Sequence, residues 1–426
     1  MTGAVGEVAI VGGGIGGLAL ALNLHARGIA CHVYEAAPAL REMGVGITLL
    51  PHGVRELTAL GLIDRIAARG IENTTSAFFN RFGQRIYDEP RGKFGGYPFS
   101  EYGIHRGKLH MTLYEAVAER LGADAVSCDR RCVGHEQDDE GVTLHFVRTD
   151  GTTAPSVRAS VVVACDGINS TIRKQYYPDE TIKFTGINTW RGVTRRKPIW
   201  DGRTYMRVGS IRTGKIVIYP IVDDIDGDGS GRQLINWMAE IQTGGTDSVD
   251  WNKVSGPEGV LPIFKDWHFD WLDVPEMIRQ ADVIFEYPMV DKDPVARWTF
   301  DRVTFAGDAA HPMYPRGSNG SAQALIDVRT LADFMVSEAD PRQAFKAYEA
   351  ARLETTAKVV RTNRSNPPDF INIRVEELTG DKPFDNLDDF ITRDELQALS
   401  DSYKRVAGFS LQDVSQQNAT GQDVAR

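Results

Sequence analysis

The chain has 426 residues and a formal net charge of −10, with 42% hydrophobic and 25% charged residues. A chain this long exceeds the size at which a single core stops growing, which excludes a small stapled module and favours two domains or one large α/β unit. The acidic balance disfavours a general electrostatic grip on nucleic acid or on an anionic membrane surface. Because no stretch approaches about 18 uninterrupted apolar residues, we also expect no membrane-spanning segment.

Cysteine and acidic residues give no metal-site pattern. The four cysteines are too few for a disulfide framework and suit the reducing cytoplasm. Cys128 and Cys132 have no second Cys or His pair nearby to complete a zinc site. Residues 223–231 begin like a calcium loop, but Ile235 stands where that loop needs a Glu, so we predict a solvated hairpin loop there. We therefore predict no metal.

The first 35 residues read as a strand, a glycine turn, a helix and a second strand. Residues 7–11 are apolar and run directly into the glycine-rich stretch 12–17. An apolar helix is predicted over 18–27, followed by a strand over 30–35 that ends in an acid. This βαβ unit is the setting in which a GxGxxG motif binds a dinucleotide.

Gly12, Gly14 and Gly17 match GxGxxG. The first glycine permits the turn, the second lets the backbone approach a pyrophosphate, and the third lets helix and strand pack closely, while the helix N-terminus offers N–H groups to the phosphates. Glu35, at the end of the second strand, can accept hydrogen bonds from the ribose hydroxyls. Together these residues predict an ADP site, which NAD and FAD share.

Later segments alternate between buried and amphipathic patterns. Residues 161–164 and 303–306 read as buried strands, whereas 184–290 alternate and are rich in aromatic residues, as in an antiparallel sheet. Helices are predicted over residues 108–121, 321–335 and 342–362. We predict an α/β (α+β overall) fold: a Rossmann-like FAD-binding domain with an inserted antiparallel-sheet substrate domain and C-terminal helices. The predicted units are residues 1–180 (FAD-binding domain, first part), 181–295 (substrate sheet), 296–365 (FAD-binding domain, second part) and 366–426 (acidic helical extension and tail).

A second signature at residues 302–320 favours FAD over NAD. Asp308, after Gly307, follows a strand and could accept a hydrogen bond from a ribityl hydroxyl. The segment from Pro315 to Gly320 then opens a helix whose N–H groups could face the N1/O2 edge of an isoalloxazine. Negative charge gathers on that edge when flavin is reduced, so a helix N-terminus there stabilises the reduced anion.

These motifs resemble those of the single-component FAD-dependent aromatic hydroxylases, the p-hydroxybenzoate and salicylate hydroxylase group. The resemblance covers roughly residues 5–365 and is carried by five segments, GGGIGG at 12–17, EAAPALREMGVGI at 35–47, IHRGKL at 104–109, CDGINSTIR at 165–173 and GDAAHPMYPRGSNG at 307–320. Three further segments look closest to the phenazine-carboxylate hydroxylase branch: IHRGKLHMTLYEAVAERLG from residue 104, WRGVT at 190–194 and YPMVDKDP at 287–294.

The resemblance implies a residue-by-residue FAD site. Arg41 and Arg106 match arginines that contact the FAD phosphate and ribityl region, and Asp166 belongs to a motif used for both FAD and the nicotinamide donor, with Arg173 holding its turn. The cofactor-binding residues expected are Gly12, Gly14, Ile15, Gly16, Gly17, Glu35, Arg41, Gly46, Ile47, Arg106, Asp166, Gly167, Gly307, Asp308, Pro315, Gly317, Ser318, Asn319 and Gly320.

The chemistry that this family implies is reduction of noncovalent FAD by NADH or NADPH, reaction with O2 to a C4a-hydroperoxide, and hydroxylation of an aromatic or heteroaromatic, acidic substrate. No second GxGxxG exists for the donor, which agrees with transient binding. Substrate contacts are expected from Arg191, Arg316, Tyr314 and Met289, and Tyr219 is the candidate catalytic base.

Two alternatives stay open. One is another FAD oxidoreductase on this scaffold, an oxidase or an epoxidase, and the other is a non-catalytic flavin-binding protein. We expect a cytoplasmic monomer or homodimer with a small-molecule aromatic substrate as its partner, and neither nucleic acid nor membrane.

Overall fold

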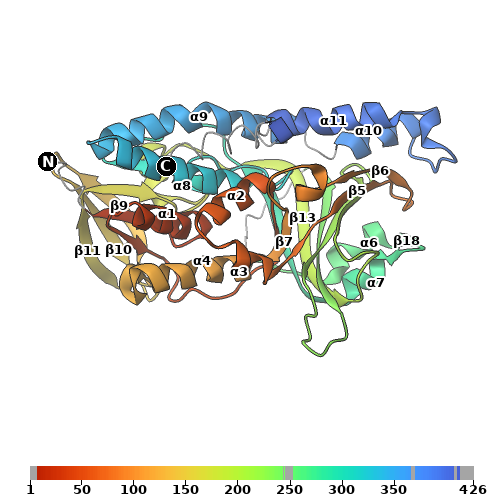
Figure 1. Cartoon of the computed structure of the whole chain (residues 1–426), viewed down its shortest axis with the longest axis horizontal. Coiled ribbons are helices and arrows are strands. Elements are labelled where there is room, and N and C mark those ends of the chain that lie inside the picture. Colours follow the sequence, from red (N-terminus) through yellow and green to blue (C-terminus); the bar gives the residue numbers. More distant parts are fainter. Residues whose placement is uncertain (1–6, 243, 245–252, 366–369, 407–409, 413–426) are drawn as a thin grey trace.

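A computed structural model describes residues 7–242, 244, 253–365, 370–406 and 410–412. The molecule is elongated, with a parallel sheet and its helices at one end and a large sheet at the other (Figure 1). Three helices run along one long side, α9 (Pro341–Ser365), α10 (Phe370–Thr379) and α11 (Arg393–Val406). No helix in the described part of the chain is long and apolar enough to cross a membrane.

The parallel sheet is assembled from segments spread over 300 residues. Its strand order is β21-β12-β1-β2-β8, and every pairing is parallel. The strands are β1 (Val8–Val11), β2 (Cys31–Tyr34), β8 (Val126–Ser127), β12 (Val161–Ala164) and β21 (Val303–Phe305). Every side chain of β1, β12 and β21 is buried, as strands covered on both faces require, whereas β2 and β8 are partly half-buried. The Rossmann-like α/β unit predicted from the sequence is therefore confirmed.

Helices and a small antiparallel sheet cover the parallel sheet. The helices are α1 (Ile15–Ala26), α4 (Arg106–Leu121), α5 (Thr171–Tyr176) and α8 (Gly320–Ser337), together with α9. The three-stranded sheet is β9 (Arg131–Gln137), β10 (Val142–Val147) and β11 (Thr153–Ala159). The helices predicted over 108–121, 321–335 and 342–362 correspond to α4, α8 and α9.

The large sheet has the strand order β17-β20-β13-β16-β15-β14-β5-β6. Its strands are β5 (Thr75–Phe79), β6 (Arg85–Pro90), β13 (Lys183–Arg196), β14 (Thr204–Ser210), β15 (Gly214–Val222), β16 (Gln233–Gln242), β17 (Lys253–Val254) and β20 (Ala281–Asp291). All pairings within residues 183–291 are antiparallel, as predicted, and the hairpin loop predicted at 223–231 joins β15 to β16.

Two strands of this sheet come from the first part of the chain. β5 pairs in parallel with β14, and β6 forms the sheet edge beyond it. Residues 75–90 therefore belong to the substrate-side sheet, although they lie within the predicted unit 1–180. One sheet thus takes strands from both sides of the predicted boundary at residue 181. The domain boundaries stay a prediction.

Small helices and small sheets pack against the large sheet. One face carries a core that includes Trp237, Phe264 and Ile278. The remaining elements are α2 (Pro51–Ala59), α3 (Ile63–Ala67), α6 (Leu261–Phe264), α7 (Val274–Arg279), the hairpin β18 (His268–Phe269) and β19 (Leu272–Asp273), and the sheet β3 (Gly46–Leu49), β7 (Tyr102–His105) and β4 (Gly70–Glu72). Close approach of β7 to β15 requires Gly103, because a Cβ there would lie 2.3 Å from the oxygen of Pro220.

Candidate active site

Four strand ends of the parallel sheet meet at one edge. The chain leaves β1 at Gly12, β2 at Glu35, β12 before Asp166, and β21 before Asp308. Because carboxyl ends of parallel strands lie on the same side of a sheet, this edge is where α/β proteins bind ligands. The fold thus brings together residues that the sequence separates by up to about 300 positions.

The glycine loop, residues 12–17, is shaped by steric necessity at two positions. Gly12 has a φ of +108°, and a Cβ there would lie 2.4 Å from the backbone oxygen of Cys165. A Cβ on Gly17 would lie 1.9 Å from the oxygen of Gly12. Gly14, by contrast, has open space around it. An open glycine at the N-terminus of α1 is what the backbone needs if a pyrophosphate is to approach it.

Glu35 and a histidine support the glycine loop from two sides. Oε2 of Glu35 accepts a hydrogen bond from the Gly13 N–H at 2.7 Å, and Oε1 accepts one from the Ala37 N–H at 2.7 Å. Each carboxylate oxygen has a second lone pair, so Glu35 can still accept the hydrogen bonds predicted from the ribose hydroxyls. On the other side, Nε2 of His110 lies 2.6 Å from the Gly13 oxygen. Sequence reasoning missed His110, although it stands one residue beyond the IHRGKL stretch.

Asp166 carries a buried acceptor without a protein partner. Its Oδ2 accepts a hydrogen bond from the Thr171 N–H at 3.0 Å, whereas Oδ1 is buried and has no partner among the described residues. Burial raises the pKa of the Asp166 carboxyl to about 6, against hydrogen bonds that lower it. A buried orphan acceptor beside the glycine loop is satisfied if a bound ligand donates to it. This atom fits a hydroxyl-bearing cofactor such as FAD.

Asp308 lies at the same edge of the parallel sheet. Its side chain is exposed, yet surrounding protein desolvates it and raises the pKa of the carboxyl, while His311 and Arg106 act in the opposite direction. Arg106, from the start of α4, is exposed and close enough to influence Asp308, so two predicted FAD residues come together. Arg41 is also exposed, on the loop between β2 and β3.

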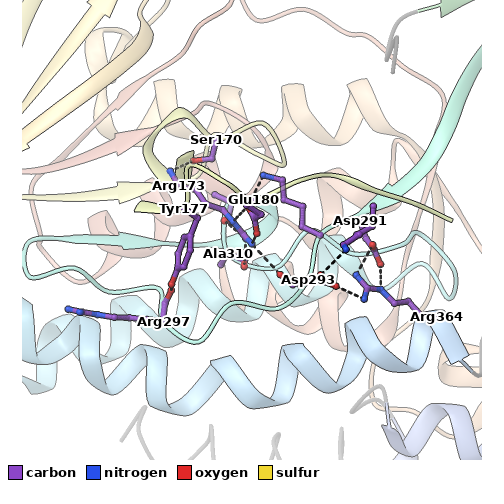
Figure 2. A network of polar contacts seen from close by, with 12 residues as sticks. Ser170, Arg173, Tyr177, Glu180, Asp291, Asp293, Arg297, Ala310 and Arg364 are labelled. Atoms are coloured by element: carbon purple, nitrogen blue, oxygen red, sulfur yellow. Dashed lines mark hydrogen bonds and ion pairs between the residues drawn. The ribbon is translucent and has the colours of Figure 1, made fainter. Parts of the chain in front are cut away.

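Arg173 ties the Asp166 turn to the turn that carries Asp308. Its buried guanidinium donates to the backbone oxygens of Ala309 at 2.9 Å and Ala310 at 2.7 Å, and it pairs with Glu180 (Figure 2). The backbone N–H of Arg173 in turn donates to Ser170, which caps α5. The role proposed for Arg173 in holding this turn therefore has a direct structural basis.

The flavin loop, residues 315–320, precedes α8 and is supported by a chain of buried side chains. Oδ1 of Asn319 lies 2.8 Å from Nε2 of His52, whose pKa burial lowers to about 4. Gln323 donates to the same oxygen at 3.2 Å. The chain continues through Arg352 to Asp327, which also pairs with His311. His311 therefore has a structural partner, Asp327, and this pair links the turn after β21 to α8.

Gly46 and Ile47, expected near the cofactor, lie where β3 meets the large sheet. The Gly46 N–H donates to Oδ1 of Asn236 at 2.7 Å, and a Cβ on Gly46 would lie 2.6 Å from Cγ of Asn236. Ile47 is half-buried. Asn236 had no distinguishing sequence pattern, because its partner is 190 residues away.

The predicted substrate residues fall into two groups. Met289 and Tyr314 are buried in one small apolar cluster with Ile187. The Cζ of Arg316 lies 5.1 Å from the centre of the Tyr314 ring, a cation–π arrangement. The second group surrounds Arg191 on β13. Its Cζ lies 5.6 Å from the centre of the Tyr287 ring, and its Nε is buried without a hydrogen-bond partner among the described residues.

Tyr287 connects this second group to the cofactor edge. Burial raises its pKa, and the charges of both Arg191 and Arg106 lower it, so the two arginines lie near the same phenol. Since Arg106 also influences Asp308, the large sheet and the carboxyl-end edge of the parallel sheet approach each other near Tyr287.

Tyr219, the candidate base, is buried on β15 and stacks on Tyr205 at a ring separation of 5.0 Å. Burial raises its pKa well above the usual value, although Arg191 acts against this. At neutral pH the Tyr219 hydroxyl is therefore protonated and suited to donating a hydrogen bond or passing on a proton. Its role as a base stays a prediction.

The sequence pattern of the family described as "FAD binding domain" matches residues 6–204 and 287–363. Phenazine 1,6-dicarboxylic acid hydroxylase PhzS from Lysobacter antibioticus is 39% identical over 364 residues, which are 84% of this chain and 89% of that protein. 3-Amino-4-hydroxybenzoate 2-monooxygenase PtnB3 from Streptomyces platensis is 33% identical over 377 residues, covering 85% and 88%. Among solved structures, Klebsiella pneumoniae HpxO complexed with FAD and uric acid superposes with a TM-score of 0.73 at 20% identity, covering 97% of each chain, which shows a shared fold.

Proposed function

Because the chain belongs to the FAD-dependent aromatic hydroxylases, we propose that it hydroxylates an aromatic or heteroaromatic carboxylic acid, with NADH or NADPH as electron donor and O2 as co-substrate. FAD, when bound, supplies electron transfer from the nicotinamide to O2 and delivery of the oxygen atom. The polypeptide has to hold the cofactor, orient the ring and keep water out.

The residues of the strand-end edge are the proposed FAD holders. Glu35 and the glycine loop would take the adenosine and pyrophosphate, and Asp308 with Arg106 would take the ribityl region. The orphan Oδ1 of Asp166 supports this assignment, because a buried acceptor at this edge lacks only a donor. The flavin loop would offer its N–H groups to the electron-rich edge of the flavin.

The proposal of an acidic substrate rests on the surroundings of Arg191. A guanidinium with a buried, unpartnered Nε beside an aromatic ring can take a carboxylate at its nitrogen and stack an aromatic body nearby. Arg316 beside Tyr314 is the second candidate for the same task. Met289 and Tyr314 would provide the apolar wall.

A substrate screen tests the proposal. Purified holoenzyme is supplied with aromatic and heteroaromatic acids, each paired with its uncharged amide, while NADH and NADPH oxidation, O2 uptake and product mass are followed. We expect acids to stimulate donor oxidation and to gain one oxygen atom, and amides to do neither. Donor oxidation that yields only hydrogen peroxide with every compound would make the protein an oxidase, and FAD binding without turnover would make it a non-catalytic flavoprotein.

Arginine variants refine the substrate assignment. Arg191→Met and Arg316→Met should each raise the KM for the acid by about 10- to 150-fold or uncouple donor oxidation from hydroxylation, the equivalent of one charge-assisted hydrogen bond. Arg212→Met is the matched control, since Arg212 forms an exposed ion pair with Glu377 at 2.8 Å. Unchanged kinetics in both site variants, with amides turning over as well as acids, would contradict the carboxylate role.

Reduction is proposed to depend on substrate. No second dinucleotide motif serves the donor, so Asp166 and the flavin loop would have to receive it after a movement that substrate triggers. Stopped-flow reduction should be much faster with an active acid than without one. Equal rates under both conditions would contradict this step.

We also propose that the enzyme works in the cytoplasm as a monomer or homodimer. NAD(P)H is available there, and the four cysteines are free thiols. Cell fractionation and light scattering test the two statements separately.

A further inference from the structure

We propose that Tyr403, on the C-terminal helix α11, is a positioning residue for the flavin loop, acting together with Asn363 on α9. This pair is called the loop clamp below. The proposal rests on the assignment of residues 315–320 to the flavin, and it adds to the site a helix that lies beyond residue 363, where the family pattern stops.

The first support is steric. A Cβ on Gly317 would lie 1.7 Å from the hydroxyl oxygen of Tyr403, so that hydroxyl rests directly on the loop backbone. Gly317 also has a φ of +83°, which a side chain would strain. Glycine at this position is therefore required both by the backbone and by the contact with Tyr403.

The second support is polar. Nδ2 of the fully buried Asn363 donates to the backbone oxygen of Tyr314 at 2.9 Å. The Tyr403 hydroxyl can donate to Oδ1 of Asn363 at 3.2 Å or to the backbone oxygen of Arg316 at 3.4 Å. A hydroxyl has one proton, so it serves these two acceptors in turn. The loop clamp thus engages two neighbouring carbonyls, that of Arg316 in the loop and that of Tyr314 immediately before it.

The position of these carbonyls sets the direction of the loop N–H groups. In a trans peptide the C=O and the following N–H point in opposite directions. Engaging the Arg316 oxygen therefore turns the Gly317 N–H away from α11. The same contact fixes the backbone from which the Arg316 side chain extends over Tyr314.

The third support is the way α11 is mounted. On β6, the edge strand of the large sheet, Glu89 accepts from Ser400 at 2.8 Å and pairs with Lys404 at 2.7 Å. The Tyr87 hydroxyl of the same strand donates to Gln397 at 2.6 Å. α11 is thus attached to the large sheet by two successive turns and to the flavin loop by Tyr403. It sets the distance between the loop and the sheet that carries Arg191.

Tyr403→Phe removes the hydroxyl and keeps the ring, and Tyr97→Phe is the matched control. Tyr97 packs in the same small cluster of Tyr403 and Leu50, but it lies outside the loop clamp. Both variants are compared with wild-type holoenzyme for FAD affinity, visible flavin spectrum, flavin midpoint potential and thermal unfolding, all without substrate. With an active acid, the fraction of donor oxidation that ends in hydrogen peroxide is added.

For Tyr403→Phe we expect an FAD Kd about 2- to 10-fold higher, the range of one neutral hydrogen bond. The spectrum should change, the midpoint potential should become more negative, and more peroxide should form. Tyr97→Phe should match wild type in every flavin property. The proposal is overturned if Tyr403→Phe matches wild type, or if the two variants lose the same stability with no flavin change. Because the flavin measurements need no substrate, they test the loop clamp even if the proposed hydroxylation fails.

Discussion

The glycine loop and the flavin loop both connect a strand of the parallel sheet to a helix, but they are held in different ways. The glycine loop packs against its own backbone and against the neighbouring strand end, and Glu35 and His110 each bind one backbone atom of Gly13. The flavin loop and Tyr314, the residue before it, are instead held by three side chains from other helices, His52, Asn363 and Tyr403.

This difference separates two kinds of constraint. A loop that packs on its own backbone has its shape determined by which residues lack a Cβ, and a single methyl group breaks it. A loop held by distant side chains keeps an adjustable position, because each support can shift. The second kind suits a segment next to a cofactor that is proposed to move between donor and substrate.

The largest effect is expected from Gly17→Ala. Its Cβ would lie 1.9 Å from the Gly12 oxygen, so the helix and strand must separate. We expect a loss of at least about 3 kcal/mol in the free energy of unfolding, at the upper end of overpacking costs. Denaturant unfolding measures it. Gly14→Ala, with open space, should keep wild-type stability and bind FAD more weakly. If both variants are as stable as wild type, backbone packing does not determine the shape of the glycine loop.

Asp166 provides a pH test on the glycine-loop side. Its pKa is raised to about 6 in the folded protein, so the folded apoprotein binds a proton more tightly than the unfolded chain does. The contribution of Asp166 to stability is therefore fully present below about pH 4 and is lost as pH rises through about 6, a change of up to about 3 kcal/mol. Denaturation of apoprotein at several pH values, with Asp166→Asn as reference, measures this. A constant difference between the two proteins across this range would contradict the assignment.

Asp308→Ala should weaken FAD retention about 10- to 150-fold, the cost of one charge-assisted hydrogen bond of about 1.5 to 3 kcal/mol. Glu35→Ala should weaken binding at the adenosine end and also release Gly13 and Ala37. Titration of apoprotein with FAD measures both. Unchanged affinity in both variants would show that the strand-end edge is not the FAD site.

The smallest effect is expected from Gly317→Ala. The new Cβ meets a side-chain hydroxyl, which can move, so we expect about 1 to 2 kcal/mol of lost stability, mostly from the positive φ. In a Tyr403→Ser background the same substitution should lose less stability than in wild type, because the space for the new Cβ is then free. If Gly317→Ala costs the same stability in both backgrounds, the contact with Tyr403 does not limit the loop.

Much of the site was predictable because its determinants are local. A βαβ unit with spaced glycines, an acid at the end of the second strand, and Asp308 after a buried strand follow from steric rules and periodicity within about 30 residues. The antiparallel sheet over 183–291 was predictable in the same way, since alternation along each strand reflects the faces that it buries.

The sequence by itself therefore determined the cofactor class and the positions at which the turns need glycine. Only the tertiary structure decided what supports the flavin loop, which sheet takes β5 and β6, and how Gly46 meets Asn236. These contacts join residues about 40 to 270 positions apart, and a hydrogen bond between them leaves no period or spacing in either segment. They depend on how the sheets and C-terminal helices pack, which local propensity does not encode.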